Sequence, residues 1–217
     1  LDDDDELAEE VKNHVKAELY AKLKNNENIF EKIDNSDPEN PEVKTVSIDM
    51  TVFVKNPNLY AREYTQEVTG WEKISGNAQA WSSWNGNDSH SNKTAYVEDC
   101  KLHPGWHAVA AVEQTITDLP AGVYTINFVG DDNSTTSDGT YAYVKTSETP
   151  AVEEGAEVNM DVNYAGYALM TNQHINDAIT DIVVTDGILT LGYAWGGNSQ
   201  AFFDEVHVLM TAPANVD

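Results

Sequence analysis

Apolar and polar residues alternate with a period of two along much of the chain after residue 45. Successive side chains of a strand point to opposite faces, so this pattern is typical of half-buried antiparallel strands. The apolar members of the two clearest runs are Tyr124, Ile126 and Phe128, and Leu189, Leu191 and Tyr193. Gly-containing turns, such as Asp186-Gly187, precede these runs. The pattern predicts an all-β fold of antiparallel sheets.

The first part of the chain follows a helical period instead. Apolar residues recur at every fourth position and form a stripe along one side of a helix, and Asp5 is a suitable helix cap. The stripe residues are Leu7, Val11, Val15, Leu19 and Leu23. We expect an amphipathic helix over 6–24, extended by one further turn at Ile29 to Ile33. Its apolar stripe has three candidate partners: the sandwich, an upstream domain or a second copy of the chain.

The domain organisation follows from composition. Residues 1–33 form the helical segment, and residues 34–44, with two prolines and many polar residues, are predicted as a linker. A β-sandwich domain is predicted over 45–212. Its first strand is expected to alternate Val46, Ile48, Met50 and Val52. Residues 162–178 lack a clean period and are expected to form a crossover loop or a short helix.

Charge excludes several classes of partner. The chain has 37 acidic and 12 basic residues, a formal net charge of −25, and a single arginine, Arg62. Nucleic acids require clustered Lys and Arg side chains, which this chain lacks. Anionic polysaccharides and acidic membrane surfaces are disfavoured by the same repulsion. A neutral partner or a cation remains.

Cysteine usage and hydropathy limit the cellular setting. Cys100 is the only cysteine, so the chain has no intrachain disulfide and no cysteine metal cluster. Its apolar runs are shorter than the roughly 20 residues that span a bilayer, so no transmembrane segment is predicted. The opening LDDDDEL resembles the interior of a longer protein, and we expect an extracellular or cell-envelope location beside neighbouring domains of the same polypeptide.

Four short motifs carry a family resemblance. They are NPNL at 56–59 followed by Gly70-Trp71, QTITDLPAGVYT at 114–125, DGILTLG at 186–192 and FFDEVHV at 202–208. Together they resemble the galactose-binding-domain-like jelly rolls, the β-sandwich of many carbohydrate-binding modules. The resemblance covers about residues 45–210. It implies an antiparallel jelly-roll sandwich in which Trp71 is a buried anchor.

Two aromatic loops are candidates for sugar binding. A pyranose ring needs a flat aromatic surface for its C–H face, and amides or carboxylates for its hydroxyls. The first loop places Trp81 and Trp84 beside Asn85, and the second places Trp195 near Asn198. In the family, the loop before the last strand commonly supplies a ligand contact, which favours Trp195 and Asn198. Core packing is the alternative for each tryptophan.

A structural calcium ion is the second implication of the resemblance. Such jelly rolls often hold calcium where the loop after the first strand meets the last strand, with carboxylate and carbonyl ligands. Asp204 matches the aspartate of the last strand, and Asp49 is the matching carboxylate near the first strand. Carbonyls around Asn56 and Asn58 would add ligands. Alternatively, Asp204 accepts backbone N–H bonds and needs no metal.

The chain shows no catalytic motif. His103 and His107 are four residues apart, but Pro104-Gly105 between them rules out a regular helix, and no HExxH, serine elbow or phosphate loop is present. We therefore predict a non-catalytic, carbohydrate-binding-module-like domain of a larger secreted or surface protein, which binds a neutral glycan. The alternative is a structural spacer or adhesion module without a sugar site.

Overall fold

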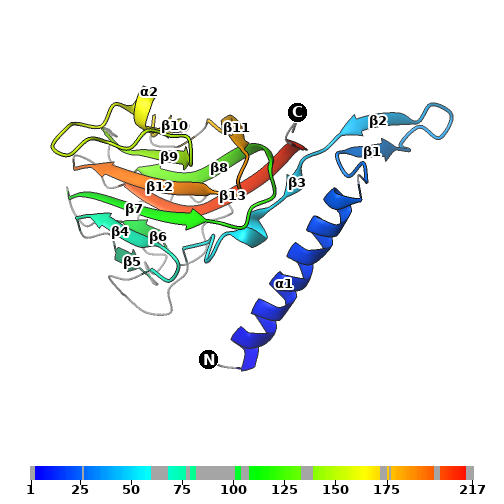
Figure 1. Cartoon of the computed structure of the whole chain (residues 1–217), viewed down its shortest axis with the longest axis horizontal. Coiled ribbons are helices and arrows are strands. Elements are labelled where there is room, and N and C mark those ends of the chain that lie inside the picture. Colours follow the sequence, from blue (N-terminus) through cyan, green and yellow to red (C-terminus); the bar gives the residue numbers. More distant parts are fainter. Residues whose placement is uncertain are drawn as a thin grey trace.

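The computed structural model describes most of the chain. The described residues are 3–25, 27–59, 68–76, 79–81, 101–103, 108–132, 139–171, 175, 177–197 and 201–213. They form a β-sandwich with a long helix and a small hairpin at its N-terminal side (Figure 1). No helix among the described residues is long and apolar enough to cross a membrane.

Two antiparallel sheets make the sandwich. Sheet I has the order β10-β9-β12-β7-β4 and sheet II the order β11-β8-β13-β6-β5, with β3 also paired to β13. The strands of sheet I are β4 (Glu72–Ser75), β7 (Val109–Ile116), β9 (Tyr141–Thr146), β10 (Gly166–Leu169) and β12 (Leu189–Gly196). The strands of sheet II are β5 (Gln79–Trp81), β6 (Lys101–His103), β8 (Gly122–Asp132), β11 (Ile179–Val184) and β13 (Ala201–Pro213).

The connections between strands are those of a jelly roll. From β7 onward the chain crosses to the other sheet at each connection except that between β9 and β10. Every strand pairing among the described residues is antiparallel. The predicted all-β, jelly-roll sandwich with one N-terminal helix is confirmed.

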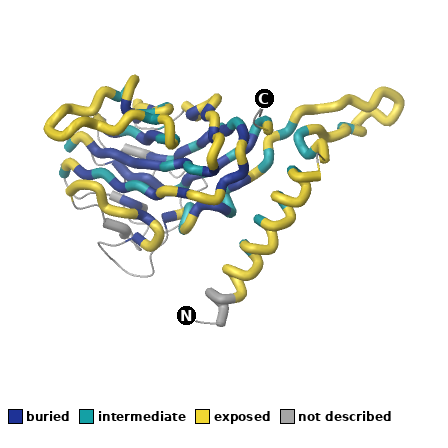
Figure 2. Tube along the Cα trace, viewed as in Figure 1, coloured by how far each residue is buried: buried dark blue, intermediate teal, exposed yellow. Residues whose placement is uncertain are grey.

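The core lies between the two sheets, as the alternation predicted. Tyr124 and Ile126 of β8 and Leu189 and Leu191 of β12 are fully buried. In Figure 2 the strands of the sandwich are largely buried, whereas the N-terminal helix and hairpin are largely exposed. Each large apolar side chain that is removed from water contributes about 1.5–3 kcal/mol, so this interior is the main source of the stability of the fold.

The N-terminal segment contains the predicted helix and an unpredicted hairpin. Helix α1 spans Asp3–Lys24. Strands β1 (Glu31–Asp34) and β2 (Glu42–Thr45) pair with each other, so the helical turn expected at 29–33 is wrong. The segment 34–44, expected as a linker, contains the turn of this hairpin. The backbone N–H of Ser36 donates to Asp34 Oδ1 and that of Glu39 to Asp37 Oδ1, and these local bonds form a turn where composition alone indicated a linker.

Helix α1 docks on the sandwich through its C-terminal half. The Tyr20 ring packs edge-to-face on Phe53 at 5.9 Å between centroids, and its hydroxyl donates to the Asp118 carbonyl. Lys16 Nζ lies 3.1 Å from Asp118 Oδ2. Leu7 and Val11, in the N-terminal half, are 60 % and 55 % exposed. Of the three candidate partners, the sandwich therefore covers only the second half of the stripe.

The first strand of the sandwich is much shorter than the sequence pattern predicts. Strand β3 contains only Ile48–Asp49, and η1, a 3-10 turn over Thr51–Phe53, follows it. Asp49 Oδ1 accepts the Thr51 N–H at 2.8 Å, which turns the chain out of the strand. The region 162–178, which lacks a clean period, contains the end of α2 (Met160–Asn163) and strand β10. The short helix therefore begins before residue 162.

Deletion of residues 1–40 should leave a folded sandwich. The buried core begins at Met50, and α1 adds only the partly buried Leu19 and Leu23 to it. We expect cooperative unfolding and the far-ultraviolet spectrum of a β protein, with a modest loss of melting temperature because Phe53 loses its Tyr20 contact. A truncated chain that shows no cooperative transition would instead make α1 an essential part of the core.

Candidate functional site

Trp195 is a core residue in this structure. Its side chain is 2 % exposed, its Nε1–H donates to the Ala201 carbonyl at 3.0 Å, and its ring contacts Phe203 edge-to-face. The prediction that Trp195 offers an exposed platform to a sugar is wrong. The physical reason is strand parity, because Trp195 continues the inward series of Leu189, Leu191 and Tyr193 in β12.

The other predicted sugar ligands are not placed by the structure. Trp84, Asn85 and Asn198 lie outside the described residues, and Trp81 ends β5 with its side chain outside the description. Trp71 is 8 % exposed, and its Nε1–H donates to the Asn56 carbonyl at 3.1 Å. The expectation that Trp71 is a buried anchor is confirmed.

The two predicted calcium ligands lie apart. Asp49 is opposite Leu209 in the β3–β13 pairing, five residues beyond Asp204 along β13. At about 3.3 Å per residue, this separates the two positions by about 16 Å. One calcium ion contacts its oxygen ligands at roughly 2.3–2.6 Å, so Asp49 and Asp204 cannot hold the same ion. The prediction of this pair as joint ligands is wrong.

Asp204 itself is buried close to the loop that the resemblance indicated. It is 8 % exposed, and the Val206 N–H two residues later donates to the Pro57 carbonyl at 3.1 Å. Burial, followed by the nearby charge of Asp204, raises the pKa of the Tyr193 phenol. Within the described ranges no three His, Cys, Asp or Glu side chains gather as a metal would require. Calcium binding at Asp204 stays a prediction.

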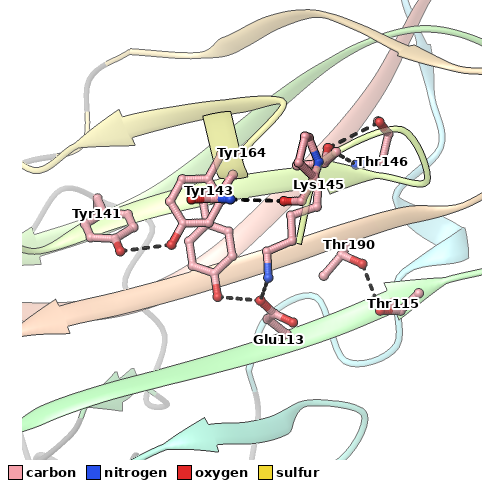
Figure 3. Close-up of polar contacts among 11 residues, drawn as sticks. Glu113, Thr115, Tyr141, Tyr143, Lys145, Thr146, Tyr164 and Thr190 are labelled. Carbon is pink, nitrogen blue, oxygen red and sulfur yellow. Dashed lines mark hydrogen bonds and ion pairs between the residues drawn. The ribbon is translucent and has the colours of Figure 1, made fainter. Parts of the chain in front are cut away.

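A different cluster lies on the outer face of sheet I. Ala142 and Val144 of β9 point into the core and are fully buried, so Tyr141, Tyr143 and Lys145 point outward. Figure 3 shows these three side chains beside residues from β7, β12 and the segment after α2. We call this cluster the tyrosine face, and it consists of Glu113, Tyr141, Tyr143, Lys145 and Tyr164.

Gly192 allows Tyr143 to lie flat across β12. Gly192 is directly opposite Tyr143 in the sheet, and a Cβ atom at Gly192 would lie 2.2 Å from the Tyr143 ring. The ring therefore reaches over β12 to β7, where its hydroxyl donates to Glu113 Oε1 at 2.7 Å. Burial, and then the charge of Glu113, raise the pKa of Tyr143, so its phenol stays protonated and keeps this donor.

Tyr164 forms a second aromatic layer on Tyr143. The two rings stack with centroids 4.2 Å apart at an angle of 25°. The hydroxyls of Tyr164 and Tyr141 lie 3.0 Å apart and form a hydrogen bond. Tyr164 follows the short helix α2, whose cap is the Asn159 side chain. The chain between β9 and β10 thereby brings an aromatic side chain back over the sheet.

Lys145 completes the cluster. Its Nζ is bonded to Glu113 Oε1, and the same ammonium lies 5.2 Å from the Tyr143 ring centroid and 5.9 Å from that of Tyr164. The Lys145 and Glu113 side chains remain 32 % and 16 % exposed. Next to them, Thr115 Oγ1 and Thr190 Oγ1 form a hydrogen bond of 2.9 Å. Stacked rings, one charge pair and a pair of threonine hydroxyls thus share one side of the sheet.

This chemistry suits a ligand that has both an apolar face and hydroxyl groups. The ring of Tyr164 offers an aromatic surface, and the charged pair and the threonines offer donors and acceptors. None of these residues is among the binding residues predicted from the sequence. The available signal was the run YAYVKT, in which the tyrosines and Lys145 share the parity opposite to the small apolar residues.

Comparison with known proteins yields structural similarity at low sequence identity. No family model matches the chain, and no curated protein matches it. The chain is similar to the solved structure of TmCBM61 in complex with β-1,4-galactotriose, with 18 % identity and a TM-score of 0.47, over 73 % of this chain and 97 % of the other. It is also similar to the enzymatically active domain of tailspike protein 4 of bacteriophage CBA120, with 16 % identity and a TM-score of 0.40, over 71 % of this chain and 22 % of the other.

Proposed function

We propose that this domain binds a neutral glycan on the tyrosine face, as a non-catalytic, carbohydrate-binding-module-like part of a larger secreted or surface protein. The observation that carries the proposal is the stack of Tyr164 on Tyr143, with Lys145 and Glu113 at its side. This combination supplies what a pyranose requires, namely a flat ring for its C–H face and polar groups for its hydroxyls.

The electrostatics favour a neutral ligand. Lys145 is paired with Glu113, so the cluster carries no net positive charge that would attract an anionic sugar. The whole chain has a formal net charge of −25, which repels anionic polymers at long range. A neutral sugar avoids this repulsion and still forms charge-assisted hydrogen bonds with the pair, which are the stronger class of hydrogen bond.

The spacer or adhesion function remains the second candidate, and one observation favours it. The β1–β2 hairpin projects from the sandwich, and its directly paired Ile33 and Val43 are 61 % and 64 % exposed. Isolated two-stranded hairpins have marginal stability in water, so this one fits packing against a neighbouring domain. This role is compatible with glycan binding, because the hairpin and the tyrosine face belong to different parts of the chain.

Replacing Tyr164 with alanine tests the proposal. Loss of the upper ring should weaken glycan binding by roughly 1–3 kcal/mol, the scale of burying one aromatic face. A glycan array of neutral oligosaccharides identifies the ligand, and isothermal titration calorimetry measures the change.

Tyr20→Ala is the matched control, since Tyr20 is a partly exposed tyrosine on α1, away from the tyrosine face. It should leave the affinity unchanged. Equal affinity of Tyr164→Ala and the parent, or no glycan bound by the parent, would contradict the proposal.

A further inference from the structure

Lys145 and Glu113 come from the strands on either side of β12 and meet above it. Glu113 lies opposite Gly192 in the β7–β12 pairing, and Lys145 lies opposite Thr190 in the β9–β12 pairing. Because Gly192 has no side chain, the Tyr143 ring lies flat over β12. Lys145 and Glu113, from the strands on either side of β12, come into direct contact beside that ring. The resulting donor and acceptor lie next to each other on an accessible face.

Both groups keep hydrogen-bonding capacity after they have paired. An ammonium has three N–H donors, and the bond to Glu113 uses one of them. Tyr143 and Lys145 both donate to Oε1 of Glu113, which leaves lone pairs on Oε2 for a further donor. The pair therefore offers an adjacent donor and acceptor to a third molecule while its own bond remains intact.

The geometry of the pair is fixed before any ligand arrives. Lys145 is held by Glu113 and by the faces of two tyrosine rings, and Glu113 is held by the Tyr143 hydroxyl. Such prior ordering lowers the entropic cost of binding. Figure 3 shows the pair at the side of the Tyr143–Tyr164 stack. A sugar ring bound beside this stack would have the pair at its edge.

We infer that the Lys145–Glu113 pair recognises a vicinal diol of the bound sugar. One hydroxyl donates to the carboxylate, and the neighbouring hydroxyl accepts from the ammonium. Two gauche hydroxyl oxygens on adjacent ring carbons are about as far apart as the heavy atoms of a hydrogen bond, roughly 2.7–3.2 Å, which matches a donor and an acceptor in contact. The ligand class is then a neutral sugar with free gauche hydroxyls on adjacent carbons, and this inference rests on the proposed function.

A cycle of variants and ligand analogues tests the inference. The probes are methyl β-D-galactopyranoside, methyl β-D-glucopyranoside, methyl α-D-mannopyranoside and the monodeoxy analogues of the glycoside that binds best, measured by titration calorimetry. Loss of one hydroxyl of the recognised diol should weaken binding to the parent about 10- to 100-fold, the range for a hydrogen bond to a charged group. Lys145→Met should weaken binding of the complete glycoside to a similar extent.

The deoxy penalties measured in Lys145→Met show whether Lys145 bonds a hydroxyl of the sugar. In Lys145→Met the analogue that lacks the ammonium-bonded hydroxyl should lose less than about threefold relative to the complete glycoside, because the partner of that hydroxyl is already absent. The analogue that lacks the carboxylate-bonded hydroxyl should keep its penalty, because Glu113 is still present. Lys44→Met is the matched control, since Lys44 is also an ion-paired lysine but lies in the β1–β2 hairpin. It should bind like the parent. Melting temperatures establish that both variants are folded.

The results separate the two proposals. If Tyr164→Ala abolishes binding while Lys145→Met and the deoxy analogues bind like the parent, the inference is overturned and the glycan-binding function stands. If the deoxy penalties are equal in the parent and in Lys145→Met, the inference is overturned as well. If none of the glycosides binds the parent, the inference falls together with the proposed function.

Discussion

Replacement of Trp195 with alanine should lower the free energy of unfolding by about 3–5 kcal/mol, the range for deleting a large buried aromatic side chain. Trp195 is 2 % exposed, and its indole packs against the rings of Phe203 and Tyr193. The variant would leave a cavity and would also remove the donor to the Ala201 carbonyl. Chemical denaturation of the variant and the parent, followed by tryptophan-independent circular dichroism, measures the difference.

Val109→Ala is the control for this measurement. Val109 belongs to β7 and lies opposite Gly196, the residue after Trp195, but it is 65 % exposed. We expect a change of less than about 0.5 kcal/mol, as for most surface substitutions. A small effect of Trp195→Ala on stability, together with a loss of glycan binding, would contradict the structure and restore Trp195 as a sugar platform.

Replacement of Gly192 with alanine should destabilise the protein by about 1–3 kcal/mol, the usual cost of inserting a methyl group where no space exists. The added Cβ atom would lie 2.2 Å from the Tyr143 ring and would displace it from its bond to Glu113. Glycan binding should fall as well, because Tyr164 stacks on the displaced ring. Denaturation and calorimetry on the same preparation measure both effects.

A double-mutant cycle tests whether the Tyr143 ring causes the loss of stability in Gly192→Ala. In a Tyr143→Ala background the obstructing ring is absent, so Gly192→Ala should be neutral or stabilising by up to about 1 kcal/mol, the ordinary gain of alanine over glycine in a strand. The same loss in both backgrounds would show that the Tyr143 ring is not responsible.

The sequence pattern was most reliable where a strand has one buried face. The parity of Leu189, Leu191 and Tyr193 placed these three side chains in the core, and their burial confirms it. The same parity extends to Trp195, but Gly196-Gly197 after it is typical of a turn, and the family resemblance favours a ligand contact in the loop before the last strand. The strand in fact continues through Gly196, so register was the better guide than local turn residues.

The tyrosine face depends on information that a single sequence does not carry. Lys145 and Glu113 are 32 residues apart and meet only because β12 lies between β9 and β7. Local pattern predicts strands and their faces, but it does not give the order of strands in a sheet. The β1–β2 hairpin was missed for a related reason, because its turn is built by aspartate side chains in a segment whose prolines and polar residues are typical of linkers.

The pairing of β3 with β13 has a mechanical consequence. Ile48 and Asp49 lie opposite Met210 and Leu209, so the chain enters and leaves the sandwich side by side, in antiparallel directions. Tension applied along the polypeptide would act first on this two-residue ladder, whose hydrogen bonds would open one after another. Until this ladder opens, the rest of the sandwich lies to the side of the load path. Once it has opened, the load reaches β13 itself, and the pairing of β13 with β8 then resists unfolding.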